Sequence, residues 1–428
     1  MAWFGRKSEA PVEVEEVEEQ PVLPDPPAPN EAGLRSMQDH IDYLLRLVEP
    51  LNPFGMSLLE AWDQVLCEDL ESLVDVPAHT TALVEGYAVR AEDLVVEDGQ
   101  SVETMDLFDG EGRLPLGAIK TVDAGDKLPP GATAVLPTTY VALEGELGRI
   151  FERVTDGEYV RTAGEHLSAG EALMHEGDVL DERHIGLLAG AGINKVFVRP
   201  RPRVVVVGSG EGLVEPGLAI QGEQTIDANS FLIAAAARAA GAQVFHVIVG
   251  SNDPAELKQA VTDQLIRADF VISTTGGRRE DYETMAATMD DIGLVDSAQV
   301  ATTPGRTQTF GLIGEDRIPM IMLPGNPVSA YVSFQAFGWP LIRKLAGAEP
   351  QRKLHRGIAT TGLRSLKGQT HLLRGIVTTE RSITRVSQVS QPHALSELAE
   401  SKILIVLDED TEQVRAGESV FYWKLDEN

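Results

Sequence analysis

The stretch "PRVVVVGSG", residues 202–210, decides the fold class of this chain. It is a short, continuous run of β-branched residues that ends in glycine, which is typical of a parallel strand buried on both faces. The segment "NSFLIAAAARAAGA", residues 229–242, follows and predicts a helix that stops at Gly241. A buried strand followed by a helix predicts the first unit of an α/β domain.

The same alternation continues along the chain. Strands are predicted in "QVFHVIVG" (243–250), "DFVIST" (269–274) and "PMIML" (319–323). A helix is predicted over 253–266, with Asp253 as its cap and Pro254 in its first turn, and another after Asp281. This series predicts a doubly wound α/β domain over 200–347, whose ligands bind at the carboxyl ends of the strands.

The flanking segments show other patterns. Residues 1–32 are acidic and proline-rich, which predicts a disordered tail. Apolar spacing predicts helices over 34–48, about 58–70 and about 180–191, and a strand over 195–199. Short apolar runs separated by Gly, Pro and Asp predict β structure over 74–160, and the last part, 348–428, predicts a small β domain.

Composition limits the possible functions. A length of 428 residues predicts several domains, and a formal net charge of −30 argues against a general nucleic-acid binder. The single cysteine, Cys67, excludes an intrachain disulfide and fits a cytoplasmic protein, and we interpret it as a buried structural thiol. No signal peptide and no membrane-spanning run is recognised.

Three loops are expected to meet at the mouth of the α/β sheet: "GSGEG" (208–212), "TTGGRRED" (274–281) and "PGNP" (324–327). Gly276 and Gly277 would let backbone amides approach an anion. Arg278 and Arg279 are suited to pairing with phosphate, or they form an ordinary solvated loop. The pattern leaves both interpretations open.

Several of these segments together resemble the MoeA family of molybdopterin molybdenumtransferases and the E domain of gephyrin. The matching segments are "VPAHTTALVEGYAVR" (76–90), "AGDKLPPGATAVL" (124–136), "VRTAGEHLSAGE" (160–171), "GSGEGL" (208–213), "IDANS" (226–230), "TTPGRT" (302–307) and "LPGNPVSA" (323–330). The last of these matches its family block intact. The similarity extends from about Leu34 to the C-terminus.

The resemblance implies a multidomain α/β protein. It implies an elongated α+β module from 33–74 and 166–199, a β-rich insert at 75–165, the central molybdopterin-binding domain at 200–347 and a C-terminal β domain at 348–428. It also implies a homodimer with a cleft between subunits. The family reaction takes adenylated molybdopterin, molybdate and Mg²⁺ and releases AMP with molybdenum cofactor.

The resemblance also assigns roles to residues. Glu85 and Asp281 take the positions of catalytic acids, and Glu211 with Asp281 would hold Mg²⁺. The cofactor-binding positions are Asp227, Asn229, Gly276, Gly277, Arg306, Pro324, Gly325, Asn326 and Pro327.

Several family positions differ in this sequence. Glu85 and Glu211 replace aspartates, and the glycine-rich loop before Asp281 is shortened. The other changed positions are Ala124, His166, Gly212, Thr303, Arg306 and Thr307. Because catalysis needs precisely placed groups, we expect the transferase activity to be impaired.

Three hypotheses follow from the resemblance, of which the last is a relic of the family that keeps only weak binding of molybdate or pterin. In the first, the chain is a gephyrin-like homodimeric adaptor that binds a partner peptide, such as the C-terminal tail of the cell-division protein FtsZ or part of a membrane receptor. In the second, it is a working transferase in which Glu85, Glu211 and Asp281 hold Mg²⁺.

Overall fold

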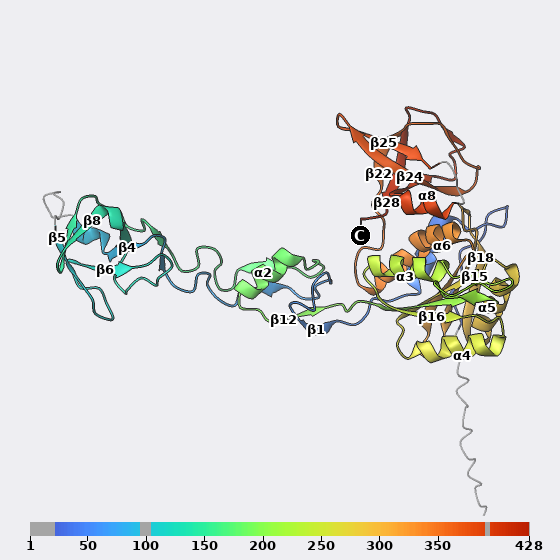
Figure 1. Ribbon diagram of the computed structural model, residues 1–428, viewed down its shortest axis with the longest axis horizontal. Coiled ribbons are helices and arrows are strands. Elements are labelled where there is room, and N and C mark those ends of the chain that lie inside the picture. Colours follow the sequence, from blue (N-terminus) through green and yellow to red (C-terminus); the bar gives the residue numbers. More distant parts are fainter. Residues whose placement is uncertain (1–21, 95–103, 390–393, 428) are drawn as a thin grey trace, which may run out of the picture. The chain divides into compact units, whose positions relative to one another are not determined.

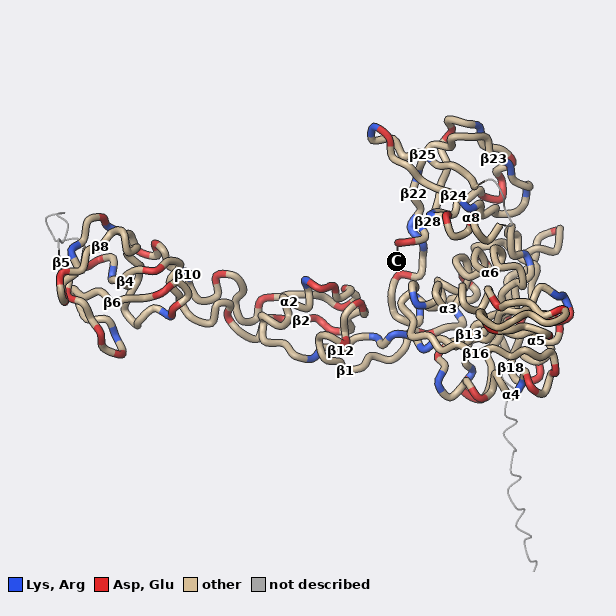
Figure 2. The backbone as a smooth tube through the Cα atoms, viewed as in Figure 1, with Lys and Arg blue, Asp and Glu red and all other residues tan. Residues whose placement is uncertain are grey.

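The computed structural model describes residues 22–94, 104–389 and 394–427. The described chain forms two compact units, shown in Figure 1. Of the described residues, one unit combines those up to Glu49, Pro202–Lys344 and those from Glu349 onward, and the other combines those between Pro50 and Arg201 with Leu345–Ala348. Acidic residues are spread over both units (Figure 2).

A six-stranded sheet forms the centre of the first unit, in the order β16-β13-β17-β21-β20-β18. Its parallel part contains β13 (Arg203–Ser209), β16 (Gln243–Val249), β17 (Phe270–Thr275) and β21 (Ile318–Leu323). These strands confirm the predicted α/β fold class. The antiparallel strands β20 (Thr307–Ile313) and β18 (Gly293–Gln299) extend one edge and were not predicted.

Helices cover both faces of this sheet (Figure 1). Side chains of α4 (Pro254–Leu265) and α5 (Arg279–Ile292) pack with Val205, Val207 and Met320 in one buried cluster. On the other face lie α3 (Asn229–Ala239) and α6 (Pro327–Ser333). Helix α6 continues through the π-helical segment η3 (Phe334–Gly338) into α7 (Trp339–Leu345).

The predicted helix signals are confirmed in detail. The Asp253 carboxylate accepts the amides of Ala255 and Glu256 at the start of α4, as expected of an N-cap. Gly241, just after α3, has φ +98°, a conformation that favours glycine. The first predicted helix is α1 (Met37–Arg46), and Arg35 just before it forms an ion pair with Asp296.

The C-terminal β domain contains a second six-stranded sheet, in the order β19-β24-β25-β22-β28-β26. Its strands are β19 (Thr302–Thr303), β22 (His355–Ala359), β24 (Thr370–Glu380), β25 (Ile383–Gln388), β26 (Ile403–Leu407) and β28 (Ser419–Lys424). Beside it lie the pair β23 (Leu363–Arg364) and β27 (Gln413–Val414) and helix α8 (Leu395–Glu400). Strand β19 belongs to the loop that leads into β20, so this loop joins the two sheets.

The second unit holds the β-rich insert. Its sheet has the order β7-β4-β6-β5-β9-β8. The strands are β4 (Gly86–Val89), β5 (Thr104–Leu107), β6 (Ala118–Val122), β7 (Ala134–Pro137), β8 (Val141–Glu144) and β9 (Leu147–Ile150). Short 3-10 turns η1 (Ala91–Leu94) and η2 (Thr138–Tyr140) accompany them.

The remainder of the second unit is a small module of short strands and one helix. Its strand pairs are β1 (Phe54–Ser57) with β12 (Lys195–Val198), β2 (Leu70–Glu71) with β11 (Ala172–Met174), and β3 (Thr81–Ala82) with β10 (Val160–Arg161). The helix predicted over 180–191 is α2 (Glu182–Gly190). The sequence-derived bounds of the domains stay a prediction.

The helix predicted over about 58–70 is wrong. This segment forms turns, with Asp63 at φ +60°, and much of its backbone from Asp63 onward pairs with distant residues. The amide of Asp63 donates to the Leu180 carbonyl at 2.7 Å, and the amide of Cys67 donates to the Phe197 carbonyl at 2.8 Å. Cys67 is half-buried, and burial raises the pKa of its thiol, in keeping with a structural role.

No helix among the described residues is long and apolar enough to cross a membrane.

Candidate functional site

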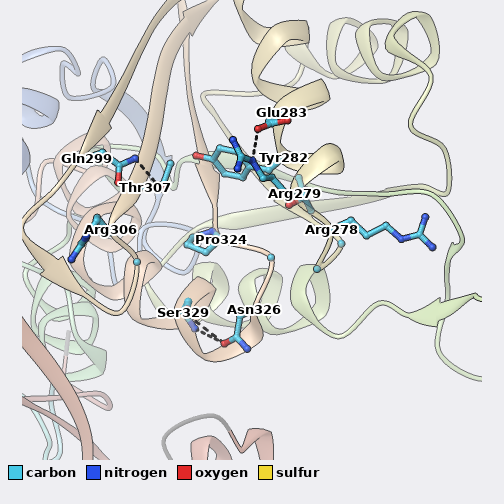
Figure 3. A pocket seen from close by; sticks show the side chains of 15 residues that line it. Arg278, Arg279, Tyr282, Glu283, Gln299, Arg306, Thr307, Pro324, Asn326 and Ser329 are labelled. Carbon is cyan, nitrogen blue, oxygen red and sulfur yellow. Dashed lines mark hydrogen bonds and ion pairs between the residues drawn. The ribbon is translucent and has the colours of Figure 1, made fainter.

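A hollow of about 680 Å³ opens at the carboxyl ends of β17 and β21 in the first unit. Figure 3 shows its side chains, which come from the loops around β17, β20 and β21 and from the first turns of α5 and α6. The lining residues are Thr275, Gly276, Gly277, Arg278, Arg279, Tyr282, Glu283, Gln299, Gly305, Arg306, Thr307, Pro324, Gly325, Asn326 and Ser329. The predicted binding residues Gly276, Gly277, Arg306, Pro324, Gly325 and Asn326 are therefore brought together.

Two of the predicted loops touch through their backbones. A Cβ atom on Gly325 would lie 2.2 Å from the carbonyl oxygen of Gly276, so only glycine fits there. The side-chain amide of Asn229 donates to the carbonyl oxygens of Thr275, at 3.3 Å, and Gly325, at 2.6 Å. Asn229 does not line the hollow. It holds the two loops that form its wall.

The "PGNP" loop is also used to start a helix. The Asn326 side chain accepts the amides of Val328 and Ser329, each at 3.1 Å, and so caps α6. Pro327 occupies the first turn of α6, where its missing N–H costs nothing. These contacts give the loop a structural role that does not require a ligand.

The loop before β20 is packed just as closely. Gly305 has φ +91°, and a Cβ atom there would lie 2.1 Å from the Ser333 hydroxyl oxygen. The Gln308 side-chain amide donates to the Gly305 carbonyl at 2.6 Å and to the Ser333 hydroxyl at 3.1 Å. This packing fixes the backbone that carries Arg306.

The lining carries more positive than negative charge. Glu283 is the one acidic residue among the lining residues, and it pairs with Arg279 at 2.6 Å. Arg278 pairs with Glu211 and Glu223, each at 3.3 Å, and in Figure 3 it extends away from Arg306. The Arg306 guanidinium makes no ion pair with any described residue. Arg306 therefore offers an unneutralised charge to an anion.

The acid Asp281 lies beneath the loops and does not line the hollow. It is 3% exposed, and a Cβ atom on Gly276 would lie 2.6 Å from its Oδ2. Its carboxylate accepts the backbone amide of Glu211, while burial raises its pKa. The position of Asp281 fits a role in holding the Gly210 and Gly276 backbones close together.

The residues present do not fit Mg²⁺ well. The cation needs several accessible oxygen ligands in near-octahedral geometry. Asp281 is turned inward, and the exposed Glu211 is paired with Arg278. Within the described residues, no group of three or more His, Cys, Asp or Glu side chains is placed to hold a metal. The Mg²⁺ assignment to Glu211 and Asp281 stays a prediction.

The other predicted residues lie elsewhere. Asp227 is buried, accepts the Ser230 amide at 3.0 Å and also accepts the Ser230 hydroxyl. The Ser230 oxygen lies 2.5 Å from His246 Nε2, and burial lowers the pKa of His246. Asp227 thus anchors the start of α3. Glu85 is exposed in the other unit, so neither unit by itself brings it together with Asp281.

Some lining residues were missed by sequence reasoning. The Tyr282 hydroxyl donates to Thr309 Oγ1 at 3.0 Å, and burial raises the pKa of Tyr282. Gln299 donates to Thr307 Oγ1 at 3.0 Å. Both depend on the antiparallel strands β18 and β20, which the strand pattern did not separate. The only sequence feature that could have pointed to these residues was the position of Tyr282, one residue after Asp281.

Comparison with known protein families identifies the class to which this α/β fold and its flanking domains belong. A model described as "Probable molybdopterin binding domain" matches residues 204–344. The models "MoeA N-terminal region (domain I and II)" and "MoeA C-terminal region (domain IV)" match residues 35–192 and 345–425. This chain belongs to the MoeA family, as the resemblance implied.

Similar proteins cover nearly the whole chain. Molybdopterin molybdenumtransferase 1 of Mycobacterium tuberculosis (strain ATCC 25618 / H37Rv) is 31% identical over 417 residues, which cover 90% of this chain and 98% of the relative. The molybdopterin molybdenumtransferase of Haemophilus influenzae is 28% identical, covering 88% and 95%.

A solved structure shares the fold. The molybdopterin biosynthesis MoeA protein of Pyrococcus horikoshii matches with a TM-score of 0.77 at 22% identity, covering 92% of this chain and 99% of that chain. This comparison confirms the multidomain MoeA architecture.

Proposed function

We propose that the hollow at the mouth of the α/β sheet binds a phosphate-bearing pterin of the molybdopterin type. The unpaired Arg306 supplies positive charge for an anion, and Arg279 belongs to the same lining. The volume of about 680 Å³ lies within the range of small-molecule sites. In a chain of net charge −30, such a local cationic lining is needed to attract an anion at all.

We propose further that the metal-dependent transfer is impaired, and that the chain acts as a homodimeric, gephyrin-like adaptor. The observation that carries this proposal is the position of the acids. Asp281 is buried against the Glu211 amide, and the Glu211 carboxylate is paired with Arg278. A cation would have to compete with both arrangements before it gained its ligands.

The dimer and the partner are part of the same proposal. Both come from the resemblance to gephyrin, whose E-domain dimer binds a short receptor peptide. The first candidate partner is the C-terminal tail of FtsZ, and the second is a segment of a membrane receptor.

The second candidate function is a working molybdopterin molybdenumtransferase. It is favoured by the open, cationic hollow and by the names of relatives that match almost end to end. In this case Glu211 would leave Arg278 and join Asp281 as a Mg²⁺ ligand, and Glu85 would supply the further carboxylate. The metal would then offset charge at the transferring phosphate.

Complementation separates the two candidates. A strain that lacks its transferase receives this chain, with the mycobacterial relative as positive control, and molybdoenzyme activity is scored. We expect no rescue at matched protein levels, together with binding of a labelled FtsZ-tail peptide by the purified protein. Rescue that needs Asp281 and Glu211 would establish the enzyme instead.

A further inference from the structure

A second, smaller hollow of about 160 Å³ lies in the first unit, away from the mouth of the α/β sheet. It is formed by α7, by the segment before β22 and by the end of β28. Its lining residues are Trp339, Arg343, Glu349, Gln351, Arg352, Lys353, Lys424 and Glu427. Figure 2 shows basic and acidic residues close together at this end of the chain. The lining therefore holds four basic and two acidic side chains.

Arg352 is the centre of this cluster. Its guanidinium lies 4.0 Å from the centre of the Trp339 ring, and it donates to the backbone carbonyls of Lys424, at 3.1 Å, and Glu427, at 3.5 Å. It also donates to the side-chain oxygen of Gln335. All of these partners are uncharged groups, and no described carboxylate forms an ion pair with Arg352. The positive charge of Arg352 is therefore not neutralised.

Burial and a neighbouring cation both disfavour this charge. Burial, with repulsion from Arg343, lowers the pKa of Arg352 to about 10. Arg343 lies over the same indole ring, 5.7 Å from its centre. The Nε atom of Arg352 and the indole N–H of Trp339 are both buried without an acceptor among the described residues. Unsatisfied buried donors are costly, so an acceptor with negative charge would relieve this arrangement.

The two acids of the lining form no ion pair with Arg352 or Lys353. Glu427 pairs with His355 and lies 3.7 Å from Lys424 Nζ. Glu349 accepts the backbone amide of Gln351 at 3.0 Å. Arg352 and Lys353 form no ion pair with a described carboxylate, so these two positive charges can match the charge of a phosphate monoester near neutral pH.

The size of the hollow restricts the ligand. A water molecule takes about 30 Å³ of liquid volume, so the hollow has room for roughly five waters. That is enough for a phosphate group and too little for a nucleotide, whose sites begin at about 300 Å³. The ligand is thus either free phosphate or the phosphate end of a molecule that extends into solvent.

We propose that this hollow binds a phosphate group, held by Arg343, Lys353 and Lys424 around Arg352 and Trp339. The hollow joins α7 of the α/β domain to the ends of β22 and β28 in the C-terminal sheet. A bound phosphate would therefore link these two domains through charge-assisted hydrogen bonds. This site is separate from the hollow around Arg306 and does not depend on the function proposed for it.

Calorimetric titration with inorganic phosphate at constant ionic strength tests this site. The protein carries Arg306→Gln, which removes the free cation of the larger hollow. We expect a binding site that persists in this background and weakens at least tenfold when Lys353→Gln and Lys424→Gln are added. Lys367→Gln with Lys402→Gln is the matched control, since both lysines are exposed in the same domain and outside the hollow.

A parallel titration with glycerol 3-phosphate identifies the source of the phosphate. Tighter binding than that of inorganic phosphate assigns the site to a phosphomonoester, and weaker binding assigns it to free phosphate. Absence of any binding in the Arg306→Gln protein overturns the proposal. Equal affinity in the two double-lysine variants overturns it as well.

Discussion

The "PGNP" loop (324–327) and the "TTGGRRED" loop (274–281) meet at the same hollow, yet the fold uses them differently. In the first, Gly325 packs against Gly276, and Asn326 caps α6. In the second, the side chain of Arg278 pairs with Glu211 and Glu223, which do not line the hollow. Packing and helix capping account for the residues of the first loop, whereas the exposed charged residues of the second loop are not fixed by packing.

This difference explains how a motif can stay intact while its chemistry changes. Close backbone contacts leave no room for another residue, so the fold alone can retain "PGNP". The exposed Glu211, Arg278 and Arg279 of the neighbouring loops are under no such packing constraint, whereas Asp281 is buried. An intact loop is therefore weaker evidence for catalysis than the state of the charged groups around it.

The largest expected effect comes from Gly325→Ala. Its Cβ atom would lie 2.2 Å from the Gly276 carbonyl, so the two loops would have to separate. We expect the free energy of unfolding to fall by about 3 kcal/mol, the upper end for overpacking. Urea denaturation measures this change.

Gly277→Ala is the matched control in the neighbouring loop. A Cβ atom there meets nothing within 4 Å, so its cost should stay within about 0.5 kcal/mol. Equal destabilisation by the two substitutions would show that the loops do not differ in the way described.

The next effect concerns ligand affinity. Arg306→Gln removes the unpaired guanidinium and should weaken binding of a phosphate-bearing pterin at least tenfold, since a hydrogen bond to a charged group contributes about 1.5–3 kcal/mol. Arg279→Gln should change the affinity about twofold, because Arg279 is largely exposed and already paired with Glu283. Fluorescence titration compares the two variants. If Arg279 proved the more important, the assignment of the free charge to Arg306 would be wrong.

A smaller effect is expected from the cap of α6. Asn326→Ala removes the acceptor for two helix amides and should lower the free energy of unfolding by about 1 kcal/mol. Ser329→Ala, which changes a neighbouring side chain on the same turn, should cost less. A loss of ligand affinity without a loss of stability in Asn326→Ala would instead assign this residue to the ligand.

The smallest effect concerns the pH dependence of Asp281. Burial raises the pKa of Asp281 in the folded state. Below the unfolded pKa the group is protonated in both states and does not change the free energy of unfolding. As the pH rises through the folded pKa, ionisation of the buried group lowers the free energy of unfolding. Relative to the unsubstituted protein, Asp281→Asn should therefore be more stable at pH 7 than at pH 3. Denaturation at both pH values measures the difference. Stabilisation by Mg²⁺ that disappears in Asp281→Asn would contradict the structural role of this acid.

The α/β fold followed from the sequence because local signals and tertiary structure agree there. The β-branched run of β13 and the Asp253 cap each act within a few residues. The helix prediction for 58–70 was wrong because this segment pairs with strands and turns about a hundred residues away, which buries its apolar residues. Local spacing does not reveal such distant partners.

The site was predictable only in part, for the same reason. Glycines and prolines that position loops stand in the sequence as motifs. The ion pairs of Arg278 join residues 67 and 55 positions apart, so their neutralising effect was invisible. Asn229 was predicted as a binding residue, and the structure shows it bridging two loops instead of lining the hollow.

Reconstitution of the transfer reaction tests the central claim most directly. The purified protein is supplied with adenylated molybdopterin, molybdate and Mg²⁺, and release of AMP is followed with the mycobacterial relative as positive control. We predict that the pterin binds in an Arg306-dependent manner and that AMP release does not exceed the background without molybdate. Molybdate-dependent AMP release that is lost in both Asp281→Asn and Glu211→Gln would contradict the claim and identify the chain as a working transferase.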